Sequence, residues 1–179
     1  MACSRFGTKS LRDVNCLAIQ PIFSAKLARL GLGNLANQVV VDTSLVVKWL
    51  IEESDSDKAN QLARLWVRNN VEPVAPYLLP IEVANVLYQR VRRSQLSSEF
   101  AGLRMDDFFD YGLQFIQPVG LHRRAIELAT QSQQGAAYDA HCLALAELLG
   151  CEYWTADERF YNAVSPAYPQ VRLLSTFTG

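Results

Sequence analysis

Four acidic residues have the type and spacing to do chemistry in this chain of 179 residues. They are Asp42, Glu82, Asp139 and Asp157. Carboxylates that cluster repel one another and raise one another's pKa unless a cation neutralises them. Oxygen ligands without histidine or thiolate partners favour Mg²⁺ or Mn²⁺ over zinc. Such ions generate hydroxide and stabilise charge on a phosphate, so the chemistry to expect is metal-assisted hydrolysis.

The elements around the first two acids predict how they are positioned. Residues 39–41 are a β-branched run that predicts a buried parallel strand ending at Asp42. Thr43 and Ser44 are suited to cap a helix that follows directly. A short extended stretch then precedes a helix that carries Glu82 in its first turn, so Glu82 is expected to reach the same end of the sheet.

The other two acids belong to the last third of the chain. Residues 136–149 predict a strong helix with Asp139 in its first turn, where the helix dipole suits an anion. Residues 151–155 predict a strand with Asp157 at its carboxyl end. Sites of open α/β sheets form outside the carboxyl ends of strands, so all four acids are expected to meet there.

Strand and helix patterns alternate along most of the chain, with further strands expected at 115–119 and 171–175. This alternation predicts an α/β fold with a mainly parallel central sheet flanked by helices. We expect one domain over residues 38–179. The chain has no internal repeat and no low-complexity tract.

Residues 1–37 differ from the remainder in charge. They hold five basic residues against one acid, a net charge of +4, whereas the other 142 residues hold twelve basic and seventeen acidic residues, a net charge of −5. We interpret 1–37 as a basic, flexible extension or a mis-called start. A transit peptide fits less well because arginines are sparse. An acidic domain that handles a polyanion needs local basic patches or metal cations.

Membrane and zinc functions are not expected. The longest charge-free runs span only 12 residues, whereas a membrane-spanning helix needs roughly 20. The cysteines show no C-x-x-C spacing, which favours idle thiols in a reducing cytoplasm. They are Cys3, Cys16, Cys142 and Cys151.

Four stretches closely resemble the motifs of PIN domains, and the nearest subgroup is the VapC-type toxins of bacterial toxin–antitoxin systems. In chain order they read VVDTSLVVKW (40–49), LPIEVANVL (79–87), AYDAHCLALA (137–146) and WTADERF (154–160). The resemblance covers residues 38–179 and implies a three-layer PIN-like fold. One such motif alone is weak evidence, but four in order are specific.

The resemblance implies a role for each acid. Asp42 and Asp139 would be the principal ligands of Mg²⁺ or Mn²⁺, and Glu82 and Asp157 would complete the acidic cluster. Three hydroxyl residues would orient these carboxylates through hydrogen bonds. They are Thr43, Ser44 and Thr155.

The resemblance also implies an activity and partners. It predicts a metal-dependent endoribonuclease that hydrolyses RNA phosphodiester bonds and acts as the toxin of a type II toxin–antitoxin system. Such a toxin is cytoplasmic, pairs as a homodimer and is inhibited by a cognate antitoxin. The basic cluster of Arg90, Arg92 and Arg93 would contact RNA or the antitoxin, although it also fits a solvated helix end.

Simpler roles remain open for the same residues. Asp42 and Asp139 suit helix starts, and Asp157 suits a turn. His141 is not expected to be a catalytic base, because two helical positions beyond Asp139 turn it about 200° away. His122 has no evident partner in the sequence.

Four other interpretations fit the sequence less well. A phosphatase of the HAD type needs a second aspartate at the position of Ser44, and a receiver domain needs a late lysine, but none follows Lys58. A nuclease for structured DNA would carry an added helical arch or binding domain. The main alternative is a catalytically silent PIN fold that binds protein or RNA, and the presence of all four acids argues against it.

Overall fold

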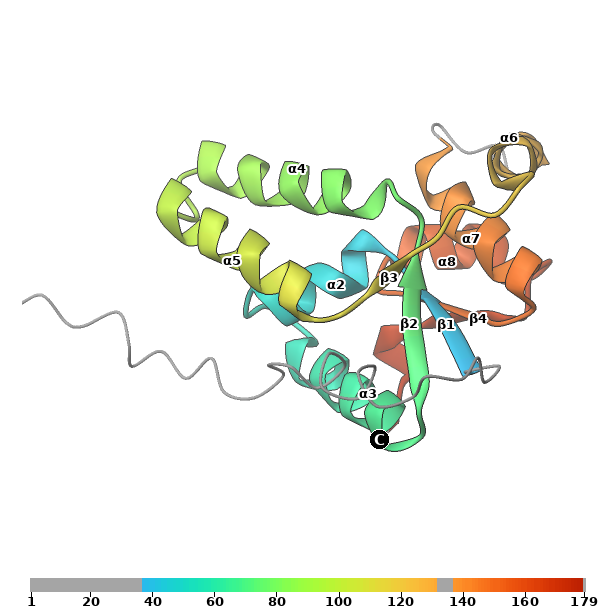
Figure 1. Cartoon of the computed structure of the whole chain (residues 1–179), viewed down its shortest axis with the longest axis horizontal. Helices are drawn as coiled ribbons and strands as arrows, with labels where there is room; N and C mark the ends of the chain where they lie inside the picture. Colours follow the sequence, from blue (N-terminus) through green and yellow to red (C-terminus); the bar gives the residue numbers. More distant parts are fainter. Residues whose placement is uncertain (1–36, 132–136, 179) are drawn as a thin grey trace, which may run out of the picture.

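A parallel β-sheet with helices on both faces forms the core of the protein (Figure 1). The computed structural model describes residues 37–131 and 137–178. Its five strands are all parallel, in the order β3-β2-β1-β4-β5, so the predicted α/β class is confirmed. The strands are β1 Asn37–Val41, β2 Val71–Ala75, β3 Gln114–Phe115, β4 Glu152–Thr155 and β5 Val171–Leu173.

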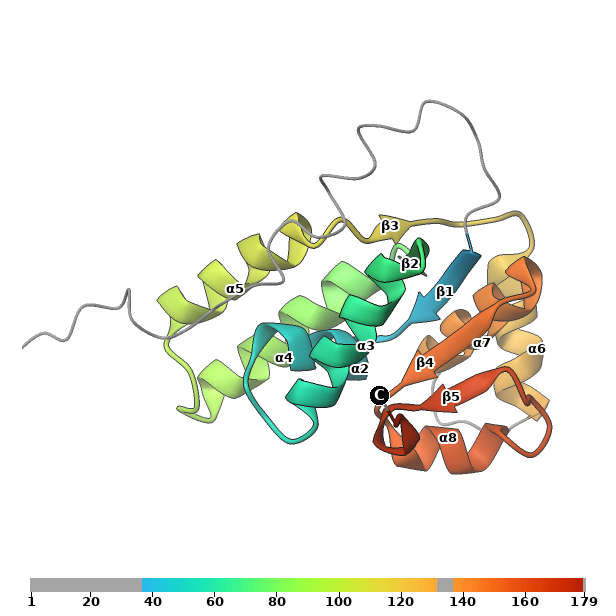
Figure 2. The ribbon, with the colours of Figure 1, turned by 90° about the horizontal axis from the view of Figure 1, so that it is seen from below.

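Seven α-helices and one 3₁₀ helix surround the described sheet. The helices are α2 Thr43–Leu50, α3 Ser56–Arg68, α4 Leu79–Arg92, α5 Ser98–Asp110, α6 Leu121–Gln131, α7 Tyr138–Leu149, α8 Glu158–Val164 and the 3₁₀ helix η1 Leu174–Thr176. Figure 2 shows α2 to α5 on one side of the strands and α6 to α8 on the other. The sheet is therefore the middle layer of three.

The strand order places a switch point between β1 and β4. The chain proceeds from β1 outward to β2 and β3, and then returns to add β4 and β5 on the other side of β1. In the register, Val41 at the end of β1 lies opposite Trp154 near the end of β4. In open α/β sheets the ligand crevice forms where the order reverses, outside the carboxyl ends of the strands.

Alternating residues of β1 fill the two layers that cover the sheet. Val39 and Val41 pack with α2, α3, α4 and α5, whereas Val40 packs with α6, α7 and α8. This alternation is the period of two expected from a strand. Because both faces are covered, β1 is apolar throughout its buried part, as the sequence predicts.

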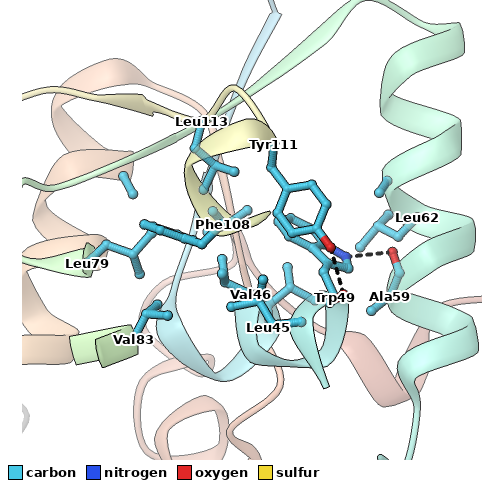
Figure 3. Packing of buried hydrophobic residues seen from close by; sticks show 14 of the residues in the cluster. Leu45, Val46, Trp49, Ala59, Leu62, Leu79, Val83, Phe108, Tyr111 and Leu113 are labelled. Carbon is cyan, nitrogen blue, oxygen red and sulfur yellow. Dashed lines mark hydrogen bonds between the residues drawn. The ribbon is translucent and has the colours of Figure 1, made fainter. Parts of the chain in front are cut away.

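An aromatic cluster fixes α2 against its neighbours (Figure 3). The indole Nε1 of Trp49 donates to the carbonyl of Ala59 on α3 at 3.0 Å, and the hydroxyl of Tyr111 donates to the carbonyl of Trp49 at 2.8 Å. Trp66 adds an edge-to-face contact with Trp49 at 6.2 Å between ring centroids. These contacts fix the helix that begins directly after Asp42.

Several predicted elements differ in extent. The strand expected at 115–119 is only Gln114–Phe115, because Pro118 has no N–H for the ladder. The strand expected at 171–175 ends at Leu173 and continues as η1. Helix α8 was not predicted, since at seven residues it is too short to show a clear apolar period.

The N-terminal extension lies almost wholly outside the described residues. Strand β1 begins at Asn37, so the interpretation of the segment before it stays a prediction. Helix α7 is described from Tyr138, and the predicted start at Ala136 also lies outside the described residues. In the part of the chain that the structure covers, every helix is too short or too polar to cross a membrane.

Candidate active site

Asp42 is a buried carboxylate held by three donors. It follows β1 and is only 4% exposed. Its Oδ1 accepts hydrogen bonds from the hydroxyl of Ser44 at 2.7 Å and the backbone N–H of Leu45 at 3.0 Å. Its Oδ2 accepts one from the hydroxyl of Tyr153 at 2.9 Å. Burial raises the pKa of this carboxyl group, and the hydrogen bonds oppose the rise.

The N-cap of α2 is Asp42, so the prediction that Thr43 or Ser44 caps this helix is wrong, and the alternative that Asp42 starts the helix is confirmed. The carboxylate reaches the N–H of Leu45, the third residue of the helix, in the usual capping geometry. Thr43 and Ser44 are the first two helical residues. The structural role of Asp42 therefore exists beside any chemical role rather than in place of it.

Ser44 joins the ends of β1 and β4. Its hydroxyl donates to Asp42, accepts from the backbone N–H of Ala156 at 2.8 Å, and lies 3.2 Å from the Oγ1 of Thr155. The same Oγ1 accepts from the backbone N–H of Asp157 at 3.0 Å. The two predicted hydroxyl residues thus lie between the strand ends. Ser44 bonds to the carboxylate of Asp42, and Thr155 accepts from the backbone of Asp157 and also opposes the rise in the pKa of Asp42.

Glu82 reaches the same edge from the first turn of α4. Thr43 donates a hydrogen bond to its Oε2 at 2.6 Å. Burial raises the pKa of Glu82, the hydrogen bond from Thr43 opposes this, and the charge of Asp42 adds to the rise. The third predicted hydroxyl residue therefore contacts an acid that lies 39 positions away in sequence.

Asp139 completes the cluster from the first turn of α7. Burial raises its pKa to about 6, with further contributions from the charges of Asp42, Glu82 and Asp157. No donor in the described residues lies within hydrogen-bond distance of its carboxylate. Asp139 thus lies close enough to the other three acids for their charges to raise its pKa, and no hydrogen bond from the described residues opposes this rise.

Asp157 lies at the exposed margin of the cluster. It follows β4 and caps α8, because its Oδ1 accepts from the backbone N–H of Phe160 at 3.0 Å. The local structural role of Asp157 is therefore that of a helix cap, where the sequence suggested a turn residue. Its charge still reaches Asp139.

Tyr153 is a site residue that the sequence did not reveal. It is fully buried on β4 and pairs in register with Val40 of β1, which brings its ring beside Asp42. A buried tyrosine normally needs a hydrogen-bond partner for its hydroxyl. That rule signals a partner near Tyr153, but only the strand pairing identifies it.

The two histidines bond to each other rather than to the acids. The Nδ1 of His141 lies 2.6 Å from the carbonyl of Ala137, which can only accept, so this nitrogen carries the proton. The Nε2 of His141 lies 3.0 Å from the Nδ1 of His122 on α6. His122 therefore has a partner that the sequence did not indicate, and His141 links α7 to α6.

The basic cluster lies at the opposite end of α4 from Glu82. Arg90 is eight residues beyond Glu82, which corresponds to about 12 Å along a helix. Arg90 forms an ion pair with Glu53, which also accepts from Lys48 at 3.0 Å. Arg92 and Arg93 are exposed. The structure therefore does not bring this cluster to the four acids.

The donor set fits a hard divalent cation. In the described residues, no ion pair includes any of the four acids, and no three His, Cys, Asp or Glu side chains converge on a single ion. Mg²⁺ is usually held by one or two carboxylates with water completing its shell, so it does not require three. Carboxylates that raise one another's pKa are the setting in which such a cation binds favourably.

Comparisons with known proteins agree with this architecture. The family model of the PIN domain matches residues 39–165, and the chain belongs to this family. PIN domains are generally nucleases. The crystal structure of PAE2754 from Pyrobaculum aerophilum superposes with a TM-score of 0.59 at 17% identity, over 80% of this chain and 94% of that one. No curated protein sequence matches the chain significantly.

Proposed function

We propose that this PIN-domain protein is a Mg²⁺- or Mn²⁺-dependent endoribonuclease that hydrolyses RNA phosphodiester bonds. One observation carries the proposal. Asp42 and Asp139 belong to one acidic cluster at the switch point of the sheet, where the carboxylate of Asp42 is buried and the pKa of Asp139 is raised. A buried charge needs a partner, and no cationic side chain of the described residues supplies one.

Each acid has a distinct part in this proposal. Asp42 and Asp139 are the principal ligands, and Glu82 and Asp157 bind a second ion or position the attacking water. When bound, the cation supplies charge stabilisation and an activated water. Tyr153 holds the carboxylate of Asp42 in one orientation through its hydrogen bond.

The proposed reaction is the hydrolysis of a phosphodiester bond. A water oxygen bonds to phosphorus in line with the 3′ oxygen, which leaves and takes up a proton. Because the pKa of Asp139 is about 6, a proton competes with the cation for this carboxylate in weakly acidic solution. Activity is therefore expected to fall below that pH.

A catalytically silent PIN fold that only binds protein or RNA is not favoured. A binding module has no need to keep four mutually repelling acids at one sheet edge, because their repulsion costs stability. All four are present, and at least Asp42, Glu82 and Asp157 exert their charge on Asp139.

The test compares Asp139→Asn and Asp42→Asn with the wild type. The matched control is Asp106→Asn, which changes an exposed acid on α5 outside the cluster. Cleavage ends mapped on total RNA, together with calorimetric titration of Mn²⁺, should show loss of cutting and weakened binding in the first two variants only. If Asp139→Asn protein cut RNA at the wild-type rate with Mg²⁺, the assignment of the site would be wrong.

We further propose that the protein is the toxin of a type II toxin–antitoxin system, cytoplasmic and homodimeric, with a cognate antitoxin that binds near the acids. Its similarity to the VapC-type motifs supports this role. The exposed Arg92 and Arg93 offer contacts for RNA or for an acidic segment of the antitoxin. Co-expression with the neighbouring gene product followed by sizing tests the pairing, and a monomer that stays uninhibited would count against it.

A further inference from the structure

The packing of α6 on α7 brings together two histidines that lie 19 positions apart. They are the only two histidines of the chain. The two helices lie side by side (Figure 1, Figure 2), and Leu121 and Ala125 of α6 belong to the same core cluster as Leu143 of α7. His122 follows Leu121 in the first turn of α6, and His141 is the fourth residue of α7. The helix packing therefore places the two rings together, and no sequence motif indicates the pair.

The spacing of the two rings matches that of two ligands on one metal ion. The Nδ1 of His122 lies 3.0 Å from the Nε2 of His141, with ring centroids 5.2 Å apart and ring planes at 64°. Two imidazole nitrogens bound to one ion at about 2.0–2.1 Å, with an angle of about 90–109° at the ion, lie about 2.8–3.4 Å apart. The observed separation falls within this range, so an ion needs the rings to tilt but does not need the helices to move.

The hydrogen bond on the far nitrogen of His141 is the one that metal-bound histidines usually make. Its Nδ1 donates to the carbonyl of Ala137, the N-cap of α7, at 2.6 Å. Histidines that ligate metals almost always donate their other ring N–H to a carboxylate, a backbone carbonyl or water, which fixes the tautomer and the ring orientation. In the neutral ring the Nε2 then has a free lone pair that points toward His122. One ligand is therefore already held in the required form.

The surroundings of the pair leave it open to a cation from solvent. His122 is exposed, so water can fill the remaining positions around an ion. The nearby guanidinium of Arg124 is paired with Glu127 at 2.9 Å and with Glu147 at 2.8 Å, which offsets its charge. Among the residues that the structure covers, no third His, Cys, Asp or Glu side chain joins the pair. The site is therefore one with two protein ligands and water.

The donor chemistry of this pair differs from that of the acidic cluster. Imidazole nitrogen suits Zn²⁺, Cu²⁺ and Ni²⁺, whereas carboxylate oxygen suits Mg²⁺ and Mn²⁺. The two sets of ligands also lie on different faces of α7, because two helical positions turn His141 about 200° from Asp139. An ion held by the histidines is therefore a different ion at a different place.

We propose that His122 and His141 form a binding site for a divalent transition-metal ion of the Zn²⁺ and Cu²⁺ class, which bridges α6 and α7. In the metal-free pair the Nδ1–H of His122 donates to the Nε2 of His141. When the ion binds, it replaces this proton between the rings, and the neutral ring of His122 carries its proton on Nε2 instead. The inference does not depend on the proposed ribonuclease activity, because none of the four acids is a ligand of this site.

The experiment titrates the full-length protein with Zn²⁺ in excess Mg²⁺, which occupies carboxylate sites. Calorimetry gives the affinity, and the ¹⁵N NMR signals of the histidine rings report where the ion binds, since the chain has only two such rings. The variants are His122→Ala and His141→Ala. The matched control is Arg123→Ala, which removes the exposed neighbour of His122 on α6, and Asp42→Asn serves as a control for the acidic cluster.

The expected result is binding of one Zn²⁺ per chain that shifts the signals of the His122 Nδ1 and the His141 Nε2. Loss of either ring should weaken this binding by more than the roughly 10- to 100-fold typical of losing an outer partner of a ligand, and should abolish the gain in thermal stability that Zn²⁺ gives. Arg123→Ala and Asp42→Asn should bind as the wild type does. Cu²⁺ should bind more tightly than Zn²⁺, and Mg²⁺ should leave the ring signals unchanged.

Three outcomes would overturn the inference. Zn²⁺ would leave the ring signals unmoved, His122→Ala would bind it as tightly as the wild type, or the signals would move only as the chain dimerises in sizing, with the ion between two copies. His122→Ala decides the matter if His141→Ala does not fold, because the ring of His122 is exposed. His122→Ala should also cut RNA with Mg²⁺ as the wild type does, so a failure of the ribonuclease proposal is read separately from a failure of this one.

Discussion

The acidic cluster has two sides that are built differently. On the strand side, Asp42 accepts three hydrogen bonds, and Ser44 and Thr155 tie the end of β1 to the end of β4. On the helix side, Glu82 accepts one hydrogen bond from Thr43, and no described donor contacts Asp139. The strand side is a hydrogen-bonded network, whereas on the helix side the charge of Glu82 raises the pKa of an Asp139 carboxylate that has no described donor.

This difference separates two tasks. A carboxylate fixed by several donors keeps its orientation whether or not a ligand is present, which suits the positioning of an ion. Carboxylates that lack donors respond strongly to added charge, as the raised pKa of Asp139 indicates. We infer that the strand side sets the geometry of the site and the helix side responds to cations, protons and substrate.

Among the residues that support the acids, the largest effect is expected at Tyr153 on the strand side. Tyr153→Phe removes the hydroxyl that donates to the Oδ2 of Asp42, inside a fully buried environment. Loss of such a supporting contact typically costs 10- to 100-fold in metal affinity or activity. Stability should also fall by about 1–3 kcal/mol because a buried acceptor loses its donor. Mn²⁺ calorimetry and urea unfolding measure the two effects.

The matched control for this variant is Tyr161→Phe on α8. The ring of Tyr161 is part-buried, and its hydroxyl has no partner in the described residues. Equal losses in the two variants would show that the hydroxyl of Tyr153 has no special part in the site, and the strand side would then lose its assigned role.

The raised pKa of Asp139 on the helix side should make the stability of the metal-free protein depend on pH. In metal-free protein the pKa of Asp139 is raised to about 6, so between about pH 4 and pH 6 the folded state holds a proton that the unfolded state has released. Stability therefore falls as pH rises through this window and stays low above it. Asp139→Asn removes the loss and should stabilise the metal-free protein by about 1–2 kcal/mol at pH 7.5 and hardly at all at pH 4.

Thermal unfolding at the two pH values measures this effect, with Asp106→Asn as the control. Mg²⁺ should stabilise the wild type at pH 7.5 more than it stabilises Asp139→Asn, because the ion offsets the same repulsion. A stabilisation by Asp139→Asn that is equal at pH 4 and pH 7.5 would contradict the electrostatic explanation.

The contrast between the two sides also explains what the sequence could predict. Asp42, Glu82 and Asp139 stand at strand ends and in first helical turns, and these positions follow from local patterns alone. The parallel sheet then brings such positions to one edge. For this reason the α/β class, and the position of these acids at one end of the sheet, could be predicted without coordinates, whereas three side chains converging on a single ion are not found among the described residues.

The partners of these residues depend on contacts far apart in sequence. The bonds from Tyr153 to Asp42 and from Thr43 to Glu82 span 111 and 39 positions, and no local pattern reports them. The sequence left the cap of α2 open between Asp42 and the next two residues, because Asp, Thr and Ser are all good caps and only the backbone geometry distinguishes them. The pairing of His122 with His141 likewise depends on how α6 packs on α7.

A smaller effect is expected at Ser44, which belongs wholly to the strand side. Ser44→Ala removes a donor to Asp42 and leaves the backbone N–H of Ala156 without its acceptor. Net losses for such hydrogen bonds are about 1 kcal/mol, so the free energy of unfolding should fall by roughly this amount. Urea unfolding measures it, with the exposed Ser98→Ala on α5 as control. If Ser44→Ala were as stable as Ser98→Ala, the hydrogen bonds of Ser44 between the ends of β1 and β4 would make no measurable contribution to stability.

The smallest effect is expected at Thr43, where the two sides meet. In the wild type, the hydrogen bond from Thr43 lowers the pKa of Glu82. Thr43→Val keeps the shape of the side chain but removes this hydrogen bond. The pKa of Glu82 should therefore rise further, so that the acidic limb of the pH–rate profile moves to higher pH while the rate at pH 8 changes by no more than about threefold. Thr43→Ser keeps the hydroxyl and should restore the wild-type profile. An equal loss of rate at every pH would instead mean that Thr43 acts through packing, and that the helix side is positioned as rigidly as the strand side.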